Sequence, residues 1–214
     1  MPGLLARVAV AVCRVFYNTF FDWSVTGREN VPQDGALLVV ANHVNAADPV
    51  LLLCAFPRWV TYMAKDELFR YPFLGALMRS GEGFPVARTG TVQEKRGAMR
   101  WAEGLLAQGH VLGLFPEGQR DRTGVLLAGK PGAAILAAHS GATLIAVAVS
   151  GTEQMRGLNC LWRHPKVTVT IGKPFRLSHT GGSISRSQAT ALTDEIMRQI
   201  AALLPNDRRG PYAD

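Results

Sequence analysis

Short apolar runs bounded by glycine, proline or charged residues recur along the chain. The clearest is ALLVVA at residues 36–41, in which every side chain is apolar. A run of this length that is bounded by turn residues is typical of a buried strand. By the same criterion, strands are predicted at 23–27, 36–41, 59–63, 84–87, 110–115, 143–149 and 166–171.

Between these runs, apolar residues recur at the three- and four-residue spacing of a helix that buries one face. The segment 93–108 follows this spacing and is stopped by Gly109, and the segment 189–203 follows it and is stopped by Pro205. Helices that alternate with strands predict an α/β fold, here a single domain with a mixed, largely parallel sheet covered by helices. Shorter helices are predicted at 49–56, 73–80 and 130–139.

The N-terminal segment 4–21 is also mostly apolar, but Arg7 and Arg14 interrupt it. No uninterrupted run reaches the roughly 18 apolar residues of a membrane-spanning helix, and the second arginine argues against a signal peptide. Because the two arginines are seven residues apart, they share one face of a helix whose other sides are apolar. We therefore expect residues 1–22 to form an amphipathic helix at a membrane interface, with simple packing on the domain as the alternative.

The rest of the chain is expected to be one domain. A length of 214 residues with 48% hydrophobic content is enough for one substantial core, and no repeat or long linker divides it. The domain is predicted to cover residues 23–205, followed by a polar tail at 206–214 that is frayed and has no assigned function. Three cysteines, Cys13, Cys54 and Cys160, are too few and too scattered for a disulfide framework or a zinc site, which favours a cytosolic protein without a metal.

The charge balance favours an anionic partner. The chain has 23 Lys and Arg against 16 Asp and Glu, a net charge of +7. Nucleic acid, phosphorylated small molecules and an acidic membrane surface all suit this charge. The basic residues are spread over many loops and form no recognised nucleic-acid motif, so no nucleic-acid partner is expected.

The strand at 36–41 is followed directly by Asn42 and His43, and Asp48-Pro49 comes five residues after the histidine. In one interpretation Asp48 only caps a helix that begins with the proline, and His43 is a loop residue. In the other, a turn brings the carboxylate to the imidazole, which can then remove a proton from a hydroxyl. The chain has no GxSxG elbow and no cysteine in a catalytic setting, so that hydroxyl is expected to belong to a substrate.

Two predicted strands end in arginine. GFPVAR ends at Arg88, and FPEGQR carries Glu117, Gly118 and Arg120. Arginine offers paired donors that suit phosphate, so two arginines at neighbouring strand ends would form an anion clamp. A surface salt bridge is the alternative for either one alone. Lys130, just before a predicted helix start, is a weaker candidate for the same anion.

Taken in order, four short motifs resemble the four sequence blocks of the glycerolipid acyltransferases, the 1-acylglycerol-3-phosphate acyltransferase or PlsC-like family. The resemblance covers about residues 25–175, and the stretch YMAKDELF, which includes Lys65, also resembles bacterial members between the first two blocks. The four motifs are NH-x4-D at 42–48, GFPVAR at 83–88, FPEGQR at 115–120 and TLIAVAV at 143–149.

The resemblance implies that His43 takes the proton from the free hydroxyl of a lysophospholipid, here lysophosphatidic acid, as that oxygen attacks the thioester of acyl-CoA or acyl carrier protein. Asp48 would orient the imidazole, and the product would be phosphatidic acid. No cofactor or metal is implied beyond the acyl donor. A lipid acceptor implies a peripheral enzyme on the cytoplasmic face of the cell membrane. The implied substrate-binding residues are Asn42, Lys65, Arg88, Glu117, Gly118, Arg120 and Lys130.

Two positions depart from the family pattern. Gln119 stands where the third block usually has a small hydroxyl residue, and Ala146 stands where the fourth commonly has proline. Neither removes the histidine or the arginines, but the first leaves the acceptor open to be another lysophospholipid or a glycolipid. A non-catalytic lipid-binding protein and a serine esterase are the remaining alternatives. The first would need a disabled base, and the second would need a nucleophile elbow.

Overall fold

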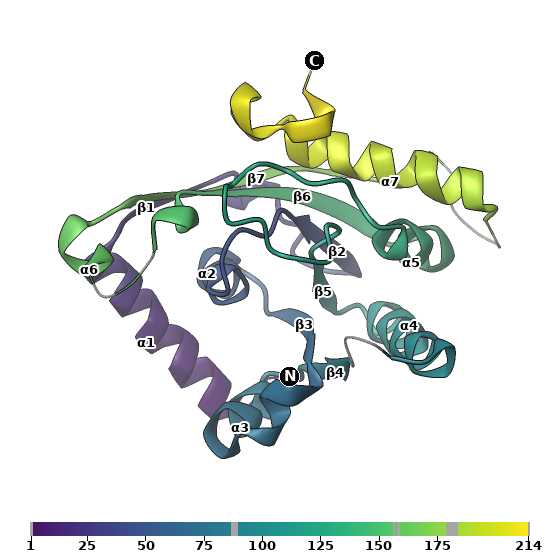
Figure 1. Ribbon diagram of the computed structural model, residues 1–214. Helices are drawn as coiled ribbons and strands as arrows, with labels where there is room; N and C mark the ends of the chain where they lie inside the picture. Colours follow the sequence, from purple (N-terminus) through teal and green to yellow (C-terminus); the bar gives the residue numbers. More distant parts are fainter. Residues whose placement is uncertain (1, 87–89, 156, 158, 179–183, 214) are drawn as a thin grey trace.

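The apolar runs of the sequence pair into one central sheet with helices on both faces (Figure 1). The computed structural model describes residues 2–86, 90–155, 157, 159–178 and 184–213. Within these residues the sheet has seven strands in the order β1-β7-β6-β2-β5-β3-β4. The strands are β1 (Asp22–Thr26), β2 (Leu37–Ala41), β3 (Val60–Lys65), β4 (Phe84–Val86), β5 (Val111–Leu114), β6 (Thr143–Ser150) and β7 (Lys166–Phe175).

Most neighbouring strands are parallel, as the alternation of strands and helices predicts. Only the β6–β7 pair is antiparallel among the described pairs. The helices are α1 (Leu4–Phe20), α2 (Asp48–Ala55), α3 (Pro72–Ser80), α4 (Val92–Ala107), α5 (Gly132–Ser140), α6 (Cys160–Arg163) and α7 (Arg186–Ala201). Short 3-10 turns are η1 (Arg28–Asn30), η2 (Asp66–Arg70), η3 (Thr152–Gln154), η4 (Asn206–Arg208) and η5 (Gly210–Tyr212).

Strand β2 lies at the centre of the core, and all five of its residues are buried. Because side chains alternate along a strand, Leu37 and Val39 face one helical layer while Leu38 and Val40 face the other. The first pair packs with residues of α1 and α2, and the second pair packs with residues of α4, α5 and α7. The predicted α/β fold, with a largely parallel sheet covered by helices on both faces, is therefore confirmed.

Helix α1 packs against α2 and α3 through one side only. Tyr17 is buried and Phe21, which follows the helix, joins the same core cluster. The outward side remains apolar: Leu4 is 76% exposed, and Val12 and Val15 are also exposed. Among the described residues, no helix is long and apolar enough to cross a bilayer.

Two segments differ from the sequence-based prediction. The sequence predicts that strand β7 ends at 171, where Gly172 and Pro174 favour a break, but the strand continues to Phe175 because it pairs with β6 through a register shift. The prediction that the C-terminal tail is frayed is wrong. It forms η4 and η5, and the Leu126 N–H donates to the Arg208 carbonyl over 2.9 Å.

We predict that Leu51→Ala lowers the free energy of unfolding by about 2–5 kcal/mol, since it removes a side chain with no exposed area from the core under α2. Leu4→Ala is the matched control, because it deletes the same atoms from a position that is 76% exposed, and it should shift the unfolding free energy little. Urea unfolding followed by circular dichroism measures both. Equal destabilisation by the two changes would contradict this packing.

Candidate active site

Three neighbouring parallel strands end at the same edge of the sheet. Strand β2 pairs in parallel with β5 on one side and with β6 on the other. The loops that follow β2 and β5 carry the motifs at 42–48 and 115–120, and β6 is followed by the turn η3, although these segments are far apart in the sequence. Ligands of open α/β sheets bind at the carboxyl ends of the strands, so this edge is the expected place for a site.

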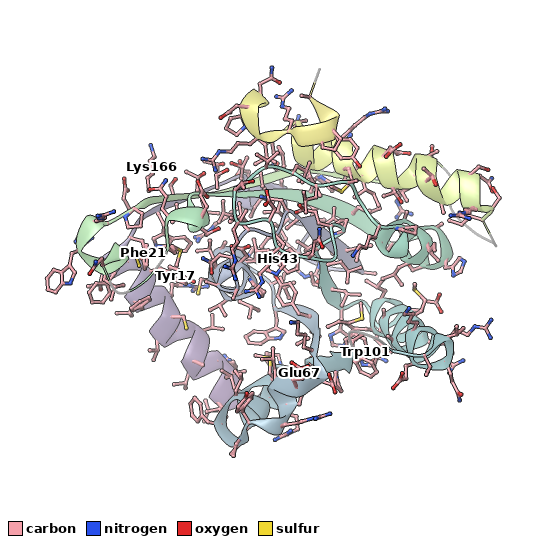
Figure 2. The ribbon with its side chains drawn as sticks, viewed as in Figure 1. Tyr17, Phe21, His43, Glu67, Trp101 and Lys166 are labelled. Atoms are coloured by element: carbon pink, nitrogen blue, oxygen red, sulfur yellow. The ribbon has the colours of Figure 1, made fainter. Side chains whose placement is uncertain are left out.

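His43 and Asp48 are in direct contact at this edge. The imidazole Nδ1 lies 2.9 Å from Asp48 Oδ2. A carboxylate only accepts, so the proton is assigned to Nδ1 and the lone pair to Nε2. The His43 side chain is 18% exposed while that of Asp48 has no exposed area, so the imidazole can reach a substrate and the carboxylate cannot. Figure 2 shows His43 near the middle of the molecule.

Asp48 does not cap helix α2. Its Oδ2 accepts hydrogen bonds from the backbone N–H groups of Val44 and Asn45, both at 2.7 Å, which precede it in the chain. Helix α2 begins at Asp48 without any side-chain cap. The carboxylate therefore folds the preceding turn around itself, and this turn brings it to His43. The capping interpretation of Asp48 is wrong.

The histidine ring is also held from the side. It stacks on Phe115 with ring centroids 4.1 Å apart, and Phe115 stacks in turn on Tyr62 at 5.9 Å. Gly113, on β5, makes room for this stack, because a Cβ there would lie 2.2 Å from the Tyr62 ring. The imidazole plane is thus fixed by one hydrogen bond and one aromatic contact.

Glu117 joins two loops of the site. The residue is 2% exposed, and its carboxylate accepts hydrogen bonds from the His43 N–H at 2.7 Å and from the Leu127 N–H at 2.9 Å. Burial raises the pKa of Glu117 to about 7, although the two backbone donors oppose this rise. Both oxygens of Glu117 therefore bind backbone N–H groups of the two loops that carry His43 and Leu127. Its predicted contact with the glycerol phosphate stays a prediction.

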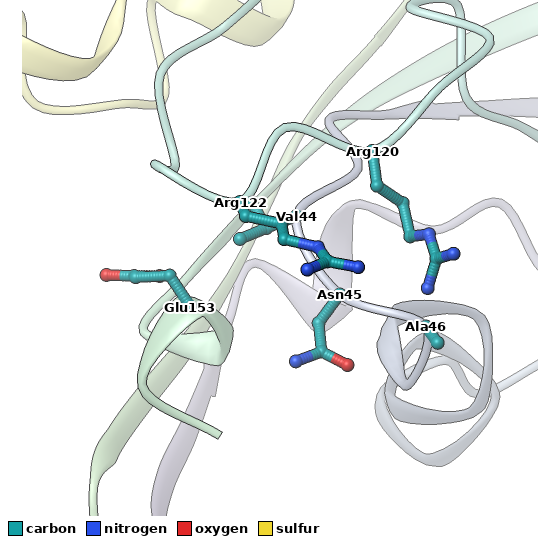
Figure 3. A pocket seen from close by; sticks show the side chains of 6 residues that line it. All are labelled: Val44, Asn45, Ala46, Arg120, Arg122 and Glu153. Carbon is teal, nitrogen blue, oxygen red and sulfur yellow. The ribbon is translucent and has the colours of Figure 1, made fainter. Parts of the chain in front are cut away.

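A cavity of about 250 Å³ opens beside the histidine loop. Figure 3 shows the guanidinium groups of Arg120 and Arg122 reaching over the loop that carries Asn45, while the carboxylate of Glu153 turns away from them. Both arginines are exposed, so the cavity presents positive charge to the solvent. It is lined by Val44, Asn45, Ala46, Arg120, Arg122 and Glu153.

The other predicted binding residues are placed differently. Lys130 lies along Gly118, since a Cβ on this glycine would come within 2.8 Å of the lysine side chain. Asn42 is 2% exposed, and its amide bonds both the N–H and the carbonyl of Val149 on β6. Lys65 is an exposed residue at the end of β3. Arg88 lies outside the described residues.

Several residues of the site were not singled out by the sequence. Asn45 donates to the Thr152 carbonyl at 2.9 Å and so ties the histidine loop to the segment after β6. Phe115, Arg122 and Glu153 lie against His43 or in the cavity wall. Arg122 follows Arg120 by two residues, and this local cluster of arginines was the one signal available. Among the described residues, no group of three His, Cys, Asp or Glu side chains is arranged to hold a metal ion.

A histidine that is hydrogen-bonded to a buried carboxylate, beside a cavity lined by two arginines, is chemically able to activate a hydroxyl near an anion. The sequence model of the Acyltransferase family matches residues 22–150, more than half of the chain. The chain therefore belongs to the Acyltransferase family, and it is a transferase of the 1-acylglycerol-3-phosphate O-acyltransferase-like, or PlsC-like, class.

Particular relatives carry the same resemblance. The chain is 27% identical over 180 residues to a 1-acyl-sn-glycerol-3-phosphate acyltransferase of Bacillus subtilis. The aligned residues cover 84% of this chain and 86% of that protein. It is 30% identical over 130 residues to the protein of that name from Borreliella burgdorferi, across 60% of this chain and about half of the relative, 51%. The crystal structure of the 1-acyl-sn-glycerophosphate acyltransferase PlsC from Thermotoga maritima matches with a TM-score of 0.67 and 26% identity, covering 89% of this chain and 77% of that one.

We predict a pH dependence of stability that Glu117→Gln removes. Because the pKa of Glu117 is raised to about 7 from a usual value of 4.5, the native state holds a proton between these pH values that the unfolded state has lost. The contribution of this group to stability therefore falls as the pH rises from about 4.5 to about 7, and is constant above. Urea unfolding at several pH values should show this slope in the wild type and not in Glu117→Gln.

The control is Glu67→Gln, which changes an exposed carboxylate far from His43 (Figure 2). It should keep the wild-type slope. If the difference in unfolding free energy between the wild type and Glu117→Gln did not vary from pH 5 to 8, the raised pKa would be refuted.

Proposed function

We propose that the protein transfers a fatty acyl group from acyl-CoA or acyl carrier protein to the free hydroxyl of lysophosphatidic acid, giving phosphatidic acid. The observation that carries this proposal is the His43–Asp48 contact at 2.9 Å directly beside a cavity lined by two arginines. The names of the bacterial relatives support the acceptor, since they describe acylation of 1-acyl-sn-glycerol 3-phosphate.

His43 acts as the general base in this proposal. Its Nε2 takes the proton of the acceptor hydroxyl while that oxygen attacks the thioester carbonyl carbon. When the tetrahedral adduct collapses, the carbon–sulfur bond breaks, and the thiolate takes the proton back from the imidazolium. Asp48 stabilises the imidazolium, because its buried carboxylate faces Nδ1. The products are the ester and a free thiol.

The acceptor phosphate is held by the cationic cavity. Arg120 and Arg122 present guanidinium groups to it, and a guanidinium binds phosphate through paired donors. Lys130 is proposed as a third cation for this phosphate; its side chain lies along Gly118, two residues before Arg120, and outside the cavity wall. The predicted contributions of Arg88, Lys65 and Asn42 remain part of the proposal, with Asn42 acting through β6 by its two bonds to Val149.

We predict that the wild type acylates lysophosphatidic acid from palmitoyl-CoA and that His43→Ala lowers kcat by roughly 10²- to 10⁴-fold, the usual contribution of a general base. His139→Ala is the matched control, because His139 also contacts a carboxylate, Glu103, at 3.0 Å but lies on α5. Thiol release and lipid product are followed together.

Each other result has a defined meaning. Thiol release without acylated lipid would indicate thioesterase chemistry in place of transfer. Acylation of another lysophospholipid or a glycolipid, but not of lysophosphatidic acid, would replace the acceptor. A wild type that is inactive with every acceptor, and with acyl carrier protein as donor, would remove the enzymatic proposal in favour of lipid binding.

The proposal includes a peripheral position on the cytoplasmic face of the cell membrane. Helix α1 exposes an apolar side that no described element covers. Arg7 and Arg14 of the same helix are also exposed. Phe73 at the first turn of α3 is also exposed, and the last residue of that helix contacts the start of α1, where the Gly3 N–H donates to the Ser80 carbonyl. An apolar surface with basic residues suits the interface of an anionic bilayer.

We predict that the protein sediments with vesicles of phosphatidylethanolamine and phosphatidylglycerol. The double change Val8→Ser with Val12→Ser should weaken binding roughly tenfold or more, because two exposed valines no longer enter the acyl region. The control is Val92→Ser with Val125→Ser, which alters exposed valines on other elements. Equal vesicle binding by both double variants would exclude α1 as the contact.

A further inference from the structure

Glu153 places a negative charge in the wall of a cavity that is proposed to bind an anion. It is the one acidic side chain among the described residues of the cavity wall, opposite Arg120 and Arg122. An anionic ligand would be repelled by this carboxylate if it faced the cavity, and the carboxylate would also pair with the arginines. What keeps Glu153 turned away therefore matters for binding.

Two donors hold the Glu153 carboxylate outside the cavity. Arg208 Nη1 donates to Oε1 over 2.6 Å, and the Gly151 N–H donates to Oε2 over 2.9 Å. Only glycine fits at position 151, since its φ is +92° and a Cβ would lie 2.0 Å from the Lys166 carbonyl oxygen. In Figure 3 the carboxylate points away from both guanidinium groups of the cavity.

Arg208 is itself fixed by the C-terminal turns η4 and η5. Its carbonyl accepts from the Leu126 N–H at 2.9 Å, and the Tyr212 hydroxyl accepts from the Gly129 N–H at 3.2 Å. The contact is close: a Cβ on Gly210 would lie 2.0 Å from the Leu126 carbonyl oxygen. In Figure 1 the C-terminal turns, in yellow, lie over the loop that leads to α5.

We propose that Arg208 is a positioning residue that keeps the cavity cationic by holding the Glu153 carboxylate out of it. The C-terminal turns thereby set the affinity for the phosphate of the acceptor, without touching the acceptor. This inference rests on the proposed function for the identity of the ligand, and on the structure for the arrangement of charges.

The consequence of losing Arg208 follows from electrostatics. The Glu153 side chain is 13% exposed and the Arg208 side chain 28%, so the pair is only partly screened by water. Without its guanidinium partner, the carboxylate keeps a single backbone bond and is attracted to the two arginines across the cavity. The anionic ligand then has to compete with a carboxylate of the protein itself.

The test is a set of three variants assayed with palmitoyl-CoA and lysophosphatidic acid. Arg208→Gln should raise the KM for the acceptor about three- to tenfold, the scale of one partly screened ion pair, with kcat unchanged. Adding Glu153→Gln to Arg208→Gln should bring the KM back toward the wild-type value, because the competing charge is gone. Arg176→Gln, which removes an arginine bound to the Gly141 carbonyl at the opposite edge of the sheet, should leave the KM unchanged.

A second measurement does not depend on catalysis. Inorganic phosphate should raise the melting temperature of the wild type, since it binds the folded cavity, and should raise that of Arg208→Gln less. The double variant should recover the wild-type shift. This readout still decides the proposal if the wild type acylates no lysophospholipid, a result that would count against the proposed function alone.

The outcomes that overturn the inference are distinct. An acceptor KM and a phosphate shift unchanged in Arg208→Gln would show that Arg208 does not control the cavity. A raised KM that persists in the double variant would show that Arg208 acts by general support of the loop, and would equally refute the positioning of Glu153. Circular dichroism and the urea midpoint confirm that each variant is folded.

Discussion

The site depends on the burial of one carboxylate. Asp48 has no exposed area, and a buried charge without partners would cost several kcal/mol or more. Its Oδ2 meets this cost with three donors: His43 Nδ1 and the N–H groups of Val44 and Asn45. Two of these donors lie in the backbone of the turn, so the shape of the turn and the orientation of the imidazole are set by the same atom.

Glu117 is likewise a buried carboxylate that needs hydrogen-bond donors, and the way in which the acidic groups are bonded determines the distribution of charge in the site. Both buried carboxylates accept from backbone N–H groups, and Glu153 is bonded outside the cavity. The acidic groups nearest the histidine are thus engaged by their own protein, while Arg120 and Arg122 face the cavity. A basic net charge alone would attract anions to any part of the surface. The two arginines instead attract an anion to the cavity beside His43.

The sequence predicts the parts of the site that are local. His43 and Asp48 are five residues apart, and the strands around them are short apolar runs. Both the pair and the strands of the sheet can therefore be predicted from short stretches of the sequence. The pairing of Glu153 with Arg208 joins residues 55 apart and has no local signal. The polar composition of 206–214 favours fraying, but hydrogen bonds to Leu126 and Gly129 order most of it. Likewise β7 extends past Pro174 only because β6 supplies a partner.

The topology of the sheet brings the loops that carry these polar groups together. Strand β2 lies between β5 and β6, so the loops after all three strands meet at one edge although about 110 residues separate the first from the last. Side chains then join the loops: Glu117 links the loop after β5 to His43, and Asn45 links the loop after β2 to Thr152. Each link uses a buried or partly buried polar group that would be costly if left unpaired. The base and the cationic cavity are therefore held together by the same hydrogen bonds that stabilise the carboxyl edge of the sheet, and a change that loosens one loop is transmitted to the others.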